Sequence, residues 1–214
     1  MRFVLQTTLP EAPLRLAQEE GCGSGFQPRL NGARLMRTFD PNEMAVVAQA
    51  VEIAEDVTAN YFKISTSQWR HVRYDIGTLA TLTAEEITDG AFAQITRYGR
   101  FPEPRLREAR PYEFFKICLQ DHNIIAALGR DENLRLNPLM VYVATHELVH
   151  VVRFCKFLQR FDAEPEERLR EEMRVHEITQ KALENVGLAH MGYVVQGYRS
   201  LGSMEVLWDH QPSS

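Results

Sequence analysis

Two histidines four residues apart, with a glutamate directly after the first, are the residues best suited to chemistry in this chain. They are His146 and His150 within the string THELVH, and the glutamate is Glu147. In a helix, residues i and i+4 lie one turn apart on one face, so both imidazoles can bind one tetrahedral cation. The carboxylate of Glu147 is expected beside the metal, where it can take a proton from a metal-bound water.

The helix expected around these residues is otherwise apolar. A histidine or glutamate that is buried without a partner costs on the order of 1–3 kcal/mol. A bound metal would satisfy all three polar groups at once, so the apolar surroundings favour a metal site. The apolar side chains on this face are Leu139, Met140, Val143, Phe154, Phe157 and Leu158.

This pattern resembles the zincin metallopeptidases, whose branches differ in the third metal ligand. The metzincin pattern would need glycine at position 153 and histidine at 156, where this sequence has Arg153 and Lys156. The gluzincin pattern takes a glutamate from a second helix. The resemblance therefore implies Zn²⁺ bound by the two histidines and Glu172, in a segment covering residues 137–187.

The face of the second helix supports Glu172 but leaves alternatives open. By the helical period, Glu172 and His176 share one face with apolar neighbours, whereas Glu171 points about 100° away, toward solvent. In gluzincins the position of His176 usually holds an acid that orients a ligand histidine. We therefore expect Glu172 as the ligand, with His176, Glu171 or another residue as alternatives.

As the resemblance implies, Glu147 would act as general base and then protonate the leaving amine during hydrolysis of a peptide bond. His190, Tyr193 or Tyr198 would stabilise the oxyanion, although simple packing explains each of them equally well. The substrate is expected to be a peptide or protein, bound along a sheet edge within residues 114–128.

Two other classes of function remain open on the sequence. The first is a non-catalytic metal-binding or interaction module that keeps the zincin scaffold. The second is a di-iron carboxylate protein, because Glu147 and His150 also form an ExxH motif. That class requires a second ExxH, whereas the next helix offers Glu172 and His176 four residues apart.

The elements that must position these residues predict an α+β, zincin-like fold. We expect a small mixed sheet packed on the helix that carries the histidines, followed by a second long ligand-bearing helix. The clearest helix start is at Asp40, where an N-cap carboxylate precedes proline and a capping-box Glu43. The predicted helices are 40–60, 83–98, 137–161 and 166–186, and the predicted strands are 61–65, 69–74, 114–119 and 123–128.

The overall composition predicts one domain at 40–214, preceded by a loop-rich arm at 1–39. The chain has 214 residues and a net charge of -5, with no dense basic run, so neither nucleic acid nor an anionic membrane is expected as partner. Three cysteines without a CxxC pair argue against a disulfide framework. With no signal-peptide or membrane-spanning segment expected, we predict a cytoplasmic location. Nothing in the sequence specifies an oligomeric state.

Overall fold

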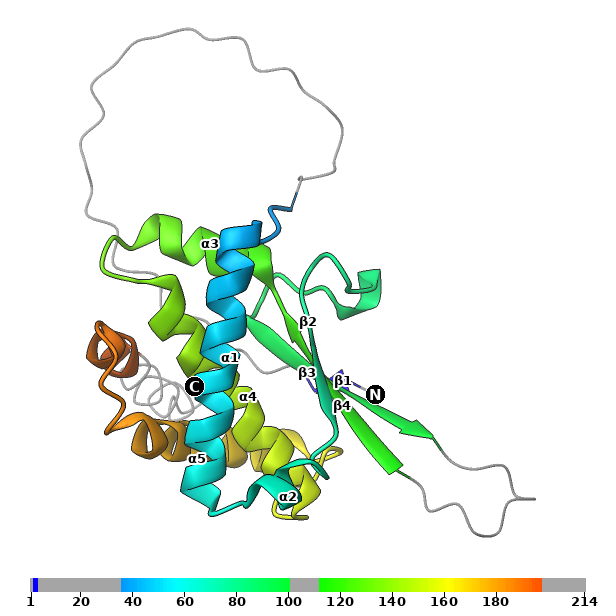
Figure 1. Ribbon diagram of the computed structural model, residues 1–214. Helices are drawn as coiled ribbons and strands as arrows, with labels where there is room; N and C mark the ends of the chain where they lie inside the picture. Colours follow the sequence, from blue (N-terminus) through cyan, green and yellow to red (C-terminus); the bar gives the residue numbers. More distant parts are fainter. Residues whose placement is uncertain (1, 4–35, 101–111, 198–214) are drawn as a thin grey trace, which may run out of the picture.

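The computed structural model describes residues 2–3, 36–100 and 112–197, and Figure 1 shows their arrangement. The fold is α+β, with helices α1, α4 and α5 lying to one side of a small sheet. The strands are β1 (Arg2–Phe3), β2 (Tyr74–Gly77), β3 (Ala93–Arg100) and β4 (Tyr112–Leu119). The helices are α1 (Pro41–Phe62), α2 (Thr66–Trp69), α3 (Asp121–Arg130), α4 (Leu136–Cys155) and α5 (Pro165–Leu183), with a 3₁₀ turn η1 (Ala84–Glu86).

The sheet is mixed, as predicted, and its strand order is β1-β3-β4-β2. Strand β4 pairs antiparallel with β3 and parallel with β2. The expectation that 114–128 forms a sheet edge is therefore wrong, because β4 lies between two strands. Of the arm expected at 1–39, Arg2–Phe3 pair with β3, while 4–35 lie outside the described residues.

Helix α4 is the centre of the core. Every residue from 138 to 154 is buried, including both histidines and Glu147. A helix without a solvent-exposed face needs packing partners around its whole circumference. Helix α1 contributes a stripe of small side chains at helical spacing that lets the two helices approach closely; its buried residues are Val47, Ala50, Ala54 and Thr58.

The predicted start of α1 is confirmed. Asp40 is the N-cap, its carboxylate accepts hydrogen bonds from the backbone of Asn42 and Glu43, and Glu43 returns a bond to the backbone of Asp40. Pro41 occupies the first turn, where its missing N–H costs nothing. The helix continues to Phe62 and ends at Lys63, which adopts a left-handed conformation with φ 53°.

Two of the predicted strand segments are wrong, and a third is displaced along the chain. Residues 61–62 complete α1. A capping box between Ser65 and Gln68 starts the short helix α2, which ends at Trp69, and the strand expected at 69–74 begins only at Tyr74, as β2. Residues 123–128 belong to α3, whose buried Asp121, Ile124 and Ala127 recur every three residues. Short apolar runs do not distinguish strand from helix, and here a helical stripe against the core decided the outcome.

The predicted helix at 83–98 is also wrong. Its capping box at Thr83 exists, but only the turn η1 follows it. Residues 93–100 instead form β3, which pairs along its whole length with β4. Long-range pairing thus overrode a local helix-start signal, and the capping glutamate Glu86 serves another purpose described below.

Helix α4 ends six residues before the predicted end at 161. The backbone N–H of Phe157 donates to Phe154 O, and that of Leu158 donates to Arg153 O. This pair of bonds is a Schellman motif with Phe157 at the left-handed position, φ 55°, which glycine usually occupies.

The second long helix, α5, starts at Pro165, close to the predicted residue 166. It ends at Leu183, three residues before the predicted end. After α5, residues 191–197 are also helical. Among the described residues, no helix is long and apolar enough to span a membrane.

Candidate metal centre

Helices α4 and α5 bring the two histidines of α4 together with Glu172. Glu172 Oε1 lies 2.9 Å from His146 Nε2, and Glu172 Oε2 lies 3.2 Å from His150 Nε2. The two Nε2 atoms lie 3.3 Å from each other. Both histidines are fully buried. Three side chains predicted to share a site therefore do converge, from two separate helices.

These distances match the spacing of ligand atoms around a small cation. In a tetrahedral site with metal–ligand bonds of about 2.0–2.1 Å, neighbouring ligand atoms lie about 3.3–3.4 Å apart. The two oxygens of Glu172 thus lie within hydrogen-bonding distance of imidazole nitrogens. A carboxylate surrounded by imidazole nitrogens at these distances fits a group arranged to hold a metal.

His176 joins the same cluster. Its Nε2 lies 3.2 Å from Glu172 Oε1, and its ring centroid lies 4.4 Å from that of His146. His146, Glu172 and His176 each offer a ligand atom within 4.8 Å of the others. Glu172, the expected third ligand, and His176, its first alternative, therefore both belong to the cluster.

Two outer partners were not anticipated from the sequence. Gln159 Oε1 lies 3.0 Å from His150 Nδ1, and the Tyr142 hydroxyl lies 3.1 Å from His176 Nδ1. Because Gln159 Oε1 can only accept, His150 Nδ1 carries the proton and leaves the Nε2 lone pair directed at the cluster. Tyr142 precedes His146 by one helical turn, so the helical period could have found it; Gln159 lies after α4 and carries no such signal.

The protonation states also suit a metal. Burial is the largest influence on His146 and lowers its pKa to about 3, so this imidazole is neutral at ordinary pH. Burial raises the pKa of Glu172, but the surrounding histidines outweigh it and hold that pKa well below 4.5. Neutral imidazole and ionised carboxylate are the forms that bind metals.

Glu147 and Glu171 occupy different environments. Glu147 is fully buried on α4, next to His146 in the chain. Glu171, expected to point toward solvent, instead forms an ion pair with the buried Arg153 of α4. Because Glu171 is paired with Arg153, the side chains that α5 contributes to the metal cluster are Glu172 and His176. The expected direction failed because α5 packs on α4 with a broader face than the one chosen from the sequence.

The candidates for oxyanion stabilisation are less well supported. The hydroxyl of Tyr193 donates to Asp131 Oδ2 at 2.7 Å, and its side chain is exposed. His190 has a left-handed backbone with φ 65° just before the helical segment 191–197. Tyr198 lies outside the described residues. Among the described residues, Tyr142 is a tyrosine that does contact the histidine–glutamate cluster.

The fold and the site therefore define an α+β protein with a His/Glu/His group, of which His146 is fully buried and the other two are partly buried, that could hold a metal. Comparison with protein-family models, with curated proteins and with solved structures returned no significant match.

Proposed function

We propose that this chain is a zinc-dependent metallopeptidase of the zincin type, with His146, His150 and Glu172 as metal ligands. The observation that carries the proposal is the convergence of two Nε2 atoms and a carboxylate at 2.9–3.3 Å. Two neutral nitrogens and one carboxylate are a ligand set found in catalytic zinc sites, which keep a further position for water. The cytoplasmic location and a peptide or protein substrate remain predictions from the sequence.

Bound zinc would supply a Lewis acid and bring the pKa of a water near neutrality. The role proposed for Glu147 is to accept the proton of that water and deliver it to the leaving amine. Two observations support this role. Glu147 is buried directly after His146 in the helix, and the group of described residues that could hold a metal does not include it. Gln159 keeps His150 in the tautomer that binds metal.

A non-catalytic metal module is the second candidate, and His176 is the observation that favours it. If His176 were a fourth ligand, the set would be closed by protein, as in structural zinc sites. The tautomer of His176 decides between the two candidates. When Tyr142 donates to Nδ1, His176 Nε2 carries a proton and donates to Glu172, so it orients the ligand; when Tyr142 accepts, Nε2 is free to bind the metal.

Glu147→Gln tests the proposed reaction. This change preserves shape and leaves the ligands untouched, so the variant is expected to keep about one zinc per chain by elemental analysis. Hydrolysis of a mixed peptide library should fall by about 10²–10⁴-fold, because an amide cannot accept the proton of water. His146→Ala is expected to lose the metal.

The matched control is Glu177→Gln, an exposed glutamate on α5, which should retain both zinc and activity. Equal cleavage by wild type and Glu147→Gln would contradict the role given to Glu147. Zinc retained in both proteins without any cleavage would favour the non-catalytic module. In that case, cobalt-substituted wild type and His176→Ala should differ in their visible absorption, which reports the coordination number.

A further inference from the structure

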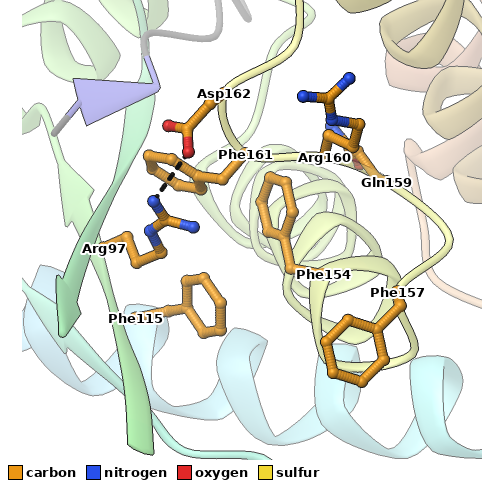
Figure 2. A pocket seen from close by; sticks show the side chains of 8 residues that line it. All are labelled: Arg97, Phe115, Phe154, Phe157, Gln159, Arg160, Phe161 and Asp162. Atoms are coloured by element: carbon orange, nitrogen blue, oxygen red, sulfur yellow. Dashed lines mark hydrogen bonds and ion pairs between the residues drawn. The ribbon is translucent and has the colours of Figure 1, made fainter. Parts of the chain in front are cut away.

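A cavity of about 290 Å³ lies beside the metal cluster, at the end of α4 (Figure 2). Its apolar part consists of four phenylalanines, and its polar part includes Gln159 and the pair formed by Arg97 and Asp162. Ligand pockets usually measure about 300–1,000 Å³, so this cavity suits one side chain of a larger ligand. The four phenylalanines are Phe115, Phe154, Phe157 and Phe161.

Two residues link the cavity directly to the cluster. Gln159 lines the cavity and bonds to His150 Nδ1. Phe154 also lines it, and its ring stacks on His150 with centroids 6.1 Å apart. A group bound in the cavity is therefore separated from a ligand histidine by a single layer of side chains.

The most unusual residue of the cavity is Phe157. Its side chain is 91% exposed, and its backbone has φ 55° at the position of the Schellman motif that favours glycine. A bulky residue in this backbone region is an outlier, and an exposed aromatic ring gains little from folding. The residue is thus unfavourable for folding on two counts, yet its ring forms one wall of the cavity.

Three charged side chains line the cavity: Arg97, Arg160 and Asp162. Arg97 forms an ion pair with Asp162 at 3.0 Å and also lies over the ring of Phe161, 4.6 Å from its centroid. An occupant therefore meets aromatic walls, the Arg97–Asp162 ion pair and the additional positive charge of Arg160. The phenylalanine walls favour an aromatic or large aliphatic group, and the excess of positive charge disfavours a basic one.

From these observations we propose that the cavity binds an aromatic or large apolar side chain of the substrate processed at the metal cluster, with Phe157 as its outer wall. That this side chain belongs to a substrate rests on the proposed function, whereas its binding in the cavity does not require a metal. Phe157 is a specificity residue in this proposal, since it would contact the substrate away from the reacting bond.

Fluorine NMR of the metal-free full chain tests the proposal, with N-acetyl-4-fluorophenylalanine amide as the probe. Wild type is expected to bind it saturably, and Phe157→Gly to bind at least about fivefold more weakly, a loss of about 1 kcal/mol. The thermal midpoint of Phe157→Gly should equal or exceed that of wild type, because glycine accepts the left-handed backbone. A purely structural role for Phe157 would predict a lower midpoint.

The matched control is Lys63→Gly, which changes the left-handed residue of the same hydrogen-bonded motif at the end of α1. It should leave binding unchanged. No saturable binding to wild type, or equal affinity in Phe157→Gly, overturns the proposal. A third outcome also overturns it: wild type forms a dimer, Phe157→Gly abolishes the dimer, and probe binding persists in that variant. Phe157 would then belong to a contact between copies of the chain. Absence of zinc binding would contradict the proposed function but leave this measurement valid.

Discussion

The outer partners of the ligand histidines determine what the cluster can do. Each imidazole binds through Nε2 only if its Nδ1 atom carries the proton, and in His150 the bond to Gln159 Oε1 fixes that choice. The equivalent position in His176 faces the Tyr142 hydroxyl, which can donate or accept. Burial raises the pKa of Tyr142, so this hydroxyl stays protonated at ordinary pH. One histidine is thus committed to metal binding and the other is not.

Replacing Gln159 with leucine should therefore weaken zinc binding. Loss of an outer partner of a ligand histidine typically costs about 10–100-fold in metal affinity, and the same loss is expected for Gln159→Leu in a competition titration with a chelator. Gln49→Leu, a change of the same kind on the exposed side of α1, should bind zinc like wild type. Unchanged affinity in Gln159→Leu would mean that its bond to His150 does not orient the ring.

At the scale of elements, the site depends on how helices and sheet are held together. The turn η1 is fixed to the sheet through Glu86, whose carboxylate accepts from Lys116 at 2.8 Å, from Tyr98 at 2.6 Å and from the backbone of Thr83. Its backbone oxygen accepts from the side chains of Gln94 and Gln120. One buried glutamate thus joins η1 to both central strands.

This arrangement predicts a loss of stability in acid. Burial raises the pKa of Glu86, but the bonds from Lys116, Tyr98 and Thr83 outweigh it and lower that pKa from 4.5 to about 2. A depressed folded-state pKa stabilises the protein above pH 4.5, and that contribution disappears as the pH falls toward 2. The full effect is on the order of 3 kcal/mol.

Urea unfolding of wild type and Glu86→Gln at pH 6, 4 and 3 checks this prediction. The difference between the two proteins should be largest at pH 6 and should shrink steadily at the lower values. Glu85→Gln, an exposed neighbour in the same turn, should unfold like wild type at every pH. A difference that did not vary with pH would assign the role of Glu86 to packing.

For the whole molecule, a metal bound between α4 and α5 would link local chemistry to global stability. Both helices contribute ligands, and α4 is buried along most of its length. Binding only to the folded state stabilises it by mass action, and a free concentration 100 times the Kd contributes about 2.7 kcal/mol.

Zinc should accordingly raise the thermal midpoint of the full chain. For a protein of this size the expected increase is about 5–10 °C between chelator-treated and zinc-loaded samples. His146→Ala should show no increase, and magnesium should not replace zinc, because it prefers oxygen ligands. An identical midpoint with and without zinc in wild type would argue against a preformed site.

Local patterns determined the parts of this protein that depend on neighbours in the chain. The capping box at Asp40 fixed where α1 begins, and the spacing of His146 and His150 put both imidazoles on one helical face. The apolar run around them predicted a buried helix. Such signals depend only on residues within one helix. The two long C-terminal helices were therefore predicted to within a few residues, apart from the end of α4.

Tertiary structure decided whatever depends on partners far along the chain. Residues 93–100 became a strand because β4 was available to pair with them, despite a helix-start signal upstream. The packing of α5 on α4 brought Glu172 and His176 to the same cluster and gave Glu171 to Arg153. Gln159 reaches His150 only because the chain turns back after α4. Periodicity places side chains on a face, but the partner that meets that face is set by long-range packing.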